Sequence, residues 1–338
     1  MKKYLYILSL FFISITSTGC EEILSMPDSE VDNLVINTIA SPNETLAVDL
    51  SLTRSIDSGT PQYGYVDYYD YYMSVDSAYY KQFVVKTADV SFSVNGGERK
   101  GTMHYDEKKY KYESDYQPKP GDNITINAEY TDAHGKTHKA YGSVDIPAKQ
   151  PEFEILSRYT YYDKCELGFF DPSGQYDIYG TDSIMSITLR LKDDKSKRNF
   201  YRLKVRGICD YNSLTRKTFS VTDIFTTDDL LLTDHTLTTS FVSWPAYFTN
   251  IFDDHLFKNN EYTITVKTRK RRGDNARVLV EYQEITPDLY YYLRSVYQYR
   301  IKNTAVLADP IGIHSNVKDG WGIIGGANAS RTIVYYEK

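Results

Sequence analysis

The sequence predicts a mostly β protein: an N-terminal β-sandwich of the immunoglobulin-like or transthyretin-like kind, followed by a second β-rich domain with one C-terminal helix. Three observations predict this class. Past residue 30 the apolar residues recur mainly with a period of two, which is typical of half-buried strands. Clusters of Gly, Pro, Asn and Asp repeatedly interrupt this alternation, as turns do. A single long stretch, at about residues 287–303, places apolar residues at helical spacing instead.

The first predicted domain covers residues 31–148 and holds about seven short strands, the number typical of such a sandwich. Its strongest turn signal is Asn95-Gly96-Gly97, which predicts a hairpin. The expected strands are 33–40, 45–52, 81–94, 99–104, 110–112, 122–130 and 136–146. Pro147 and Pro151 bracket a short linker, and the domain boundary is placed there.

The second predicted domain covers residues 151–338, with strands expected at 152–159, 183–192, 199–209, 261–270 and 277–284. Its helix begins after Thr286, an N-cap residue followed by Pro287 and by Asp288 in the first turn. The face formed by Leu289, Leu293 and Val296 is expected to pack on the sheet of this domain.

A glycine-rich segment, residues 320–326, superficially resembles a phosphate-binding loop. It lacks the Lys-Ser/Thr that follows such a loop and precedes no helix. We expect its glycines to let the terminal strand pass close to another backbone.

Residues 1–19 have the features of a signal peptide. Lys2 and Lys3 precede an apolar stretch at residues 4–16, which is too short to span a bilayer. Ser17-Thr18-Gly19-Cys20 resembles a bacterial lipobox, so Cys20 is the predicted lipidation site and residues 20–30 form a tether. Several acyl chains on one residue give stable membrane anchoring. The alternative is a plain secretory signal with an incidental Cys.

The net charge of -6 becomes -8 once residues 1–19, with Lys2 and Lys3, are removed. An acidic chain argues against nucleic acid as a partner. The basic run at residues 267–272 is interpreted as a solvated hairpin tip. Glu21 and Glu22 follow Cys20 directly and resemble the surface-export signals of Bacteroidota lipoproteins, which favours the outer face of the outer membrane.

Two cysteines, Cys165 and Cys209, remain in the mature chain. In an oxidising compartment they could form one disulfide, and two buried thiols are the alternative. Neither has the electropositive setting and nearby His that a catalytic Cys requires.

Tyrosine is the unusual residue of this chain, at 33 of 338 residues against 14 Phe. Eight of the tyrosines fall within residues 63–80, interleaved with Asp. Tyr offers a large contact area at low side-chain entropy cost, as it does in antibody loops. The hypothesised ligand-binding residues are therefore Tyr63, Tyr65, Tyr68, Tyr69, Tyr71 and Tyr72. The alternative is a hairpin whose tyrosines pack on the sandwich or on the neighbouring domain.

No motif of a catalytic or metal site is present in the sequence. Asp253-Asp254-His255 cannot supply three converging ligands from a strand, and the better interpretation is turn acids that cap backbone amides. The sequence has no calcium loop and no Gly-x-Ser-x-Gly. We expect no metal, no cofactor and no enzymatic activity.

Several short motifs lie in a characteristic order along the chain. After the lipobox they are Leu34-Val35-Ile36-Asn37, Gly121-Asp122, Ile146-Pro147, Asn199-Phe200-Tyr201-Arg202-Leu203, Phe252-Asp253-Asp254, Tyr290-Tyr291-Tyr292-Leu293-Arg294-Ser295, Asp309-Pro310, Ser315-Asn316-Val317, Gly320 and Gly322-Ile323. Together they resemble the Bacteroidota lipoprotein family catalogued as domain of unknown function 4249. The resemblance implies a partnership with a TonB-dependent outer-membrane transporter, for which the protein would capture or present a ligand. A structural or adhesive surface lipoprotein that binds macromolecules through the Tyr-rich segment is the alternative.

Overall fold

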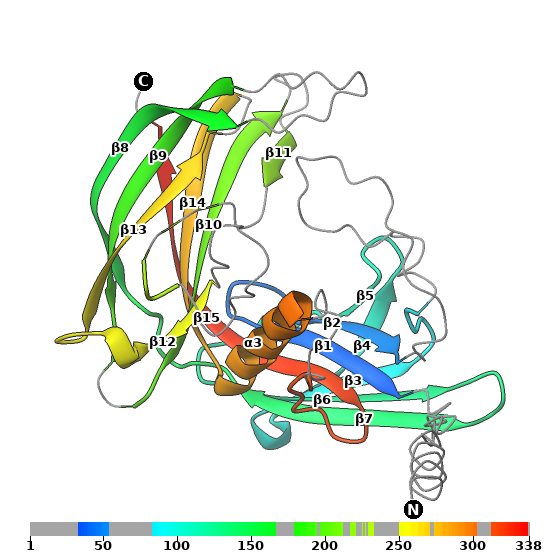
Figure 1. Cartoon of the computed structure of the whole chain (residues 1–338). Coiled ribbons are helices and arrows are strands. Elements are labelled where there is room, and N and C mark those ends of the chain that lie inside the picture. The colour runs from blue at the N-terminus through cyan, green and yellow to red at the C-terminus, as the bar shows by residue number, and fades with distance from the viewer. Residues whose placement is uncertain are drawn as a thin grey trace, which may run out of the picture.

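The computed structural model describes residues 33–53, 83–166, 179–194, 197–211, 217–220, 225, 227, 229–232, 250–270, 274–302 and 312–336. Within these residues the fold is mostly β, as predicted, and consists of one twelve-stranded mixed sheet and one three-stranded sheet. One long helix of the described residues lies against the larger sheet (Figure 1).

The strands of the first half are β1 (Leu34–Ala40), β2 (Ala47–Leu52), β3 (Asp89–Val94), β4 (Arg99–Asp106), β5 (Lys111–Glu113), β6 (Asn123–Thr131) and β7 (Thr137–Asp145). Those of the second half are β8 (Phe153–Glu166), β9 (Tyr179–Lys192), β10 (Phe200–Tyr211), β11 (Lys217–Ser220), β12 (Ile251–Asp253), β13 (Glu261–Arg269), β14 (Asp274–Ile285) and β15 (Trp321–Tyr335). The helix is α3 (Pro287–Lys302), close to the predicted bounds, and two 3-10 turns are η2 (Asn95–Gly97) and η4 (Asp254–Leu256).

The N-terminal sandwich comprises β1–β7 together with residues 321–326 of β15. Its strands follow the order β15-β1-β2-β5-β4-β3-β6-β7 and curl into two layers, with β6 and β7 beneath β1 and β2 (Figure 1). The predicted alternation is clearest in β7, where exposed and buried residues alternate throughout. The inward residues form one apolar core, whose fully buried members include Leu34, Ile36, Val48, Ile124, Ile126 and Ile324.

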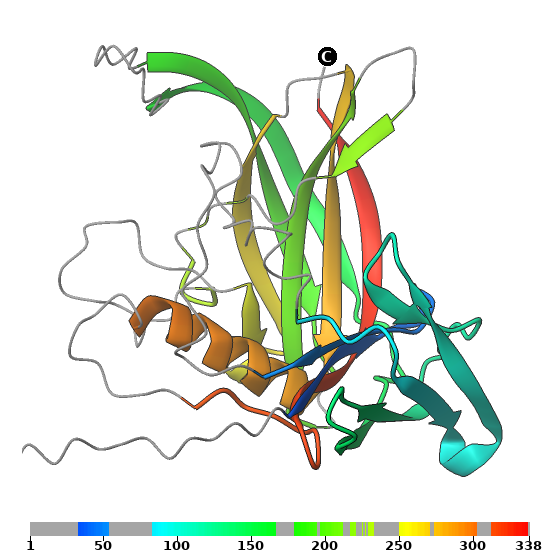
Figure 2. The same ribbon diagram turned by 90° about the vertical axis from the view of Figure 1, so that its right-hand side faces the viewer.

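The C-terminal sandwich comprises β8–β14 together with residues 327–335 of β15. The three-stranded sheet, in the order β13-β9-β8, packs on the β10-β14-β15 part of the large sheet (Figures 1 and 2). Its core combines aliphatic side chains with aromatic rings in contact, among them Ile187, Leu189, Val205, Val280, Tyr201 and Tyr282.

The last strand, β15, belongs to both sandwiches, as its path in Figure 2 shows. Residues 321–326 pair in parallel with β1, and residues 327–335 pair antiparallel with β14. The parallel pairing brings backbones very close, because a Cβ placed on Gly322 would lie 2.1 Å from the carbonyl oxygen of Ile36. Gly322 also has φ +109°, a conformation that other residues rarely adopt. The expected close approach of the glycine-rich segment to another backbone is confirmed.

Helix α3 covers the outer face of the large sheet beside this junction. Thr286 precedes Pro287 as predicted, and its carbonyl accepts the hydrogen bond from Tyr290 N at 3.0 Å. Its hydroxyl accepts a hydrogen bond from Gly326 N of β15 at 3.1 Å. Leu289 is buried against Gly325. Tyrosine hydroxyls donate to Asn37 of β1 (Tyr292, 3.4 Å) and to Asn250 (Tyr297, 2.8 Å), so α3 contacts both sandwiches.

Three strands differ most from their predicted bounds. The strand expected at 81–94 is β3 at Asp89–Val94 only, because Val84 bridges Ser51 and Val85 N donates to Leu50 O, which draws this segment to β2. Strands β8 and β9 run further than the expected 152–159 and 183–192, because they pair with each other along almost their full length.

Replacing Gly322 by Ala is expected to lower the free energy of unfolding by at least about 2 kcal/mol, since the new methyl meets the Ile36 carbonyl. Gly135→Ala is the matched control. Gly135 also has positive φ, but nothing lies within 4 Å of its Cβ position, so a cost of about 1 kcal/mol is expected. Urea unfolding followed by circular dichroism measures both; equal costs would contradict a role for the close approach.

Candidate functional site

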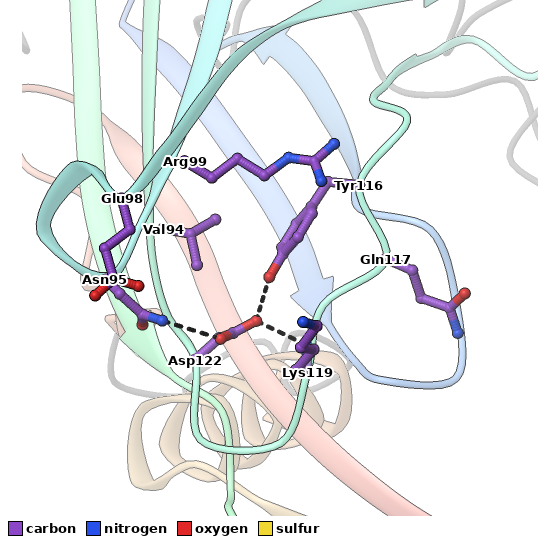
Figure 3. Close-up of a pocket in the computed structure, with 8 residues that line it drawn as sticks. All are labelled: Val94, Asn95, Glu98, Arg99, Tyr116, Gln117, Lys119 and Asp122. Atoms are coloured by element: carbon purple, nitrogen blue, oxygen red, sulfur yellow. Dashed lines mark hydrogen bonds between the residues drawn. The ribbon is translucent and has the colours of Figure 1, made fainter.

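An open polar depression lies at one end of the N-terminal sandwich (Figure 3). It has a volume of about 540 Å³. It forms where η2 meets the segment that leads into β6. Its lining residues are Val94, Asn95, Glu98, Arg99, Tyr116, Gln117, Lys119 and Asp122.

Asp122 holds the floor of this depression together and is only 6% exposed. Its carboxylate accepts hydrogen bonds from the Tyr116 hydroxyl, from Lys119 N at 2.7 Å and from Asn95 Nδ2 at 3.2 Å (Figure 3). Asn95 in turn accepts a hydrogen bond from Asn123 N at 2.9 Å. One carboxylate therefore joins the η2 turn to the segment that precedes β6.

The protonation states in this cluster follow from burial and hydrogen bonding. Burial, followed by the hydrogen bond to Asp122, raises the pKa of Tyr116 to about 12. Burial acts to raise the pKa of Asp122, but the donors Tyr116, Lys119 N and Asn95 outweigh it, so that pKa is lowered. At neutral pH a carboxylate thus faces a neutral phenol.

The exposed rim of the depression carries the groups able to meet a ligand. The Arg99 guanidinium lies 4.7 Å from the centre of the Tyr116 ring and pairs with Asp115 at 3.2 Å. Glu98 and Lys119 also line the depression. Because Asp122 is satisfied by the chain itself, the exposed rim residues are the groups available for polar contacts with a ligand.

A second charged cluster lies on the face of β14 opposite the C-terminal core. The Glu281 side chain is 1% exposed, with Arg331 Nε of β15 at 2.5 Å and Lys204 Nζ of β10 at 3.5 Å. Both partners lie directly across from Glu281 in the strand registers. Arg331 also pairs with Glu44, in the turn after β1, at 3.5 Å. Arg331 therefore links Glu281 of the C-terminal sandwich to Glu44 of the N-terminal sandwich. Its charge also compensates Glu281, because a buried carboxylate needs paired cations.

The acidic residues of the predicted turn have the capping role that the sequence indicates. Asp253 accepts a hydrogen bond from His255 N at 3.3 Å and also pairs with Arg198 at 2.5 Å. Asp254 accepts from Asn199 N at 2.9 Å. Among the residues that the structure describes, no group of three or more His, Cys, Asp or Glu could hold a metal ion.

Most of the predicted site residues lie outside the described residues. These are Cys20 and the six tyrosines Tyr63, Tyr65, Tyr68, Tyr69, Tyr71 and Tyr72. Cys209 is buried on β10, and Cys165 belongs to β8, but the Cys165 side chain is not among those described. Their disulfide stays a prediction. Within the described ranges, no helix is long and apolar enough to cross a membrane.

Large aromatic side chains are exposed at several places on the described surface. Tyr159 and Tyr162 of β8 are 53% and 77% exposed, and Trp321, Tyr291 and Tyr335 are also exposed. Exposed tyrosines therefore also occur on β8, a strand that the sequence patterns did not indicate as a binding site. The signal available was the run Tyr159-Thr160-Tyr161-Tyr162, which begins at the last residue of a predicted strand and continues past it.

Fold and surface together define a mostly β, two-sandwich protein with open polar and aromatic surfaces. A family model described as "Domain of unknown function (DUF4249)" matches residues 21–333, nearly the whole chain. The chain therefore belongs to that family, as the sequence motifs predicted. A search of curated proteins found no matching relative.

Replacing Asp122 by Asn is expected to lower the free energy of unfolding at pH 7 by about 1–3 kcal/mol, because three donors lose their charged acceptor. The folded-state pKa of Asp122 is lowered, so its contribution is present above about pH 4 and is lost as pH falls through that pKa. Denaturant unfolding at pH 7 and pH 3 should therefore show that the difference in unfolding free energy between wild type and Asp122→Asn is smaller at pH 3.

The matched control for this measurement is Asp115→Asn. The Asp115 side chain is 84% exposed, so its pair with Arg99 is expected to contribute less than about 1 kcal/mol at either pH. If the difference in unfolding free energy between wild type and Asp122→Asn stayed constant from pH 7 to pH 3, a stabilising role of the ionised Asp122 carboxylate would be contradicted.

Proposed function

We propose that this protein is a lipid-anchored lipoprotein of the outer membrane, exposed at the cell surface, that acts as a non-enzymatic accessory to a TonB-dependent transporter. In this role it captures or presents a ligand for the transporter.

The observation that carries this proposal is where the family match begins. The matched region starts at residue 21, directly after Cys20 of the predicted lipobox, and runs to residue 333. The family region and the predicted mature protein are thus nearly the same segment. The partnership with a transporter comes from the resemblance to lipoproteins of this family.

The described surface supports a binding role. The depression at the end of the N-terminal sandwich is open and polar, with a central carboxylate that the chain itself satisfies. Exposed tyrosines on β8 add amphipathic contact area of the kind that protein-binding surfaces use. Glu21 and Glu22 support a location on the outer face of the membrane.

If Cys20 carries the lipid, Cys20→Ser is expected to abolish lipidation. In a native-type host, wild type is expected to incorporate labelled palmitate and to sediment with the outer membrane. The variant should lose the label and keep residues 1–19, because signal removal at a lipobox follows modification of the Cys. Gel mobility and membrane fractionation measure both; a labelled, membrane-bound Cys20→Ser chain would overturn the assignment. Cys209→Ser, which alters a buried thiol on β10, is the matched control and should label normally.

The accessory role predicts that a transporter is recovered with the tagged protein from membranes extracted in mild detergent. Mass spectrometry of the eluate should find one TonB-dependent transporter at a near-stoichiometric level, and the Cys20→Ser chain should recover much less because it lacks the anchor. Recovery of no transporter from wild type would contradict the role.

The second candidate is an adhesive surface lipoprotein that binds macromolecules through its Tyr-rich segment, and the eight tyrosines within residues 63–80 favour it. The two functions separate experimentally. A small ligand retained in native mass spectrometry favours the accessory role. Binding to a glycan array or a host protein without a transporter, weakened by Tyr→Ala at residues 68 and 69, favours adhesion.

A further inference from the structure

Strand β8 forms a long free edge of the three-stranded sheet (Figure 1). It spans Phe153–Glu166, whereas strands typically have five or six residues. Across the described part of the chain it pairs with β9 alone. Its other side therefore presents a row of backbone N–H and C=O groups, which another extended backbone can pair with.

The free part of this edge begins at a β-bulge. The register shifts between Ile155 and Ser157, so Leu156 is the extra residue. Before the bulge, Phe153 and Ile155 pack against the core of the C-terminal sandwich. After it, the residues from Ser157 to Tyr159 are all exposed.

Both faces of the strand are open beyond the bulge. Arg158 lies opposite Ile187, a core residue, and so points to the core side of the sheet, as does Tyr162 four residues further on. Arg158 is nevertheless exposed, and Tyr162 is 77% exposed. The opposing sheet therefore does not cover this part of β8. This leaves space for another strand beside the β8 edge.

We propose that β8 pairs with β8 of a second copy of this chain, antiparallel about a two-fold axis at Thr160. The two three-stranded sheets then join into one six-stranded sheet. The pairing requires neither lipidation nor a transporter, so it stands apart from the proposed function.

Side-chain complementarity favours a second copy and selects this register. A two-fold axis perpendicular to the sheet keeps each face on its own side, so opposed residues share a face. With Thr160 opposite its own copy, Tyr159 lies opposite Tyr161 on the outer face, and Arg158 lies opposite Tyr162 on the other. Aromatic cross-strand pairs and an Arg over a Tyr ring are both stabilising.

Neighbouring registers lose contacts or oppose like charges. An axis at Tyr159 places Arg158 opposite Thr160 and so removes the Arg–Tyr pair. An axis at Tyr161 places Arg158 opposite Lys164, and an axis at Arg158 places this residue opposite itself. Like charges directly opposite each other destabilise an antiparallel pair. The axis at Thr160 opposes no like charges between Ser157 and Asp163.

The test is a cysteine at the axis. Thr160→Cys is made in the full chain with Cys165→Ser and Cys209→Ser, and Cys20 is kept for the anchor. Residues opposite each other in an antiparallel pair have Cα atoms about 4.5–5.5 Å apart, within the range for a disulfide. Mild oxidation of intact membranes should convert most of the protein into a reducible species of twice the mass.

Neighbouring positions supply the matched controls. Tyr159→Cys or Tyr161→Cys alone should cross-link several-fold less than Thr160→Cys, because each faces the other and not itself. Co-expression of these two variants should restore the cross-link. Stronger cross-linking at 159 or 161 alone would overturn the register, and no cross-link at any position would overturn the pairing.

The unsubstituted chain provides a measurement without cysteine changes. Light scattering in detergent is expected to give a dimer whose dissociation constant rises at least about tenfold in Thr160→Lys, which opposes two charges, and little in Thr160→Val. A monomer for the unsubstituted chain at all concentrations would overturn the proposal. The proposal would also be overturned if the β8 amides were protected from hydrogen exchange only when a different protein co-purifies. In that case β8 would pair with that protein and not with a second copy of this chain.

Discussion

The parallel pairing of β15 with β1 is the contact on which the rest of the structure depends. Gly322 allows the two backbones to approach, and the same strand then continues as the antiparallel neighbour of β14. One strand thus completes two cores. Helix α3 lies over the point where β15 passes from one core to the other. Arg331 of β15 forms ion pairs with both Glu281 and Glu44.

The fold class could be predicted from the sequence because it depends on local patterns. Period-two burial in β7, the Asn95-Gly96-Gly97 turn and the Pro287 start of α3 each act over a few residues. Strand ends were less predictable because they depend on distant partners. Val84 and Val85 leave the expected strand for β2, and β8 is long because β9 continues beside it. The hydroxyl of Thr286 bonds Gly326, forty residues away, which no local pattern reveals.

The same distinction applies to the polar sites. Asp253 caps the nearby amide of His255, and its position in a turn was enough to predict this. Asp254 instead accepts from Asn199 N, 55 residues away in the sequence. Asp122 follows a Gly in a turn, but its partners Asn95 and Tyr116 come from separate segments. Glu281 occupies a strand position that resembles any exposed one, and it is buried because Lys204 and Arg331 are placed across from it by the sheet. Burial of charge is a property of the assembled sheet.

The place of β15 in the sheet also governs the order in which the chain can fold. The first described strand, β1, pairs with the nearby β2 on one side but obtains its other neighbour only from residues 321–326, nearly three hundred positions later. Contacts of such high sequence separation slow folding, because a large loop must close before they stabilise anything. The N-terminal sandwich is therefore incomplete while the chain is still being synthesised or threaded through a pore. The proposed export would therefore carry a chain whose N-terminal sandwich is completed only after residues 321–326 have arrived.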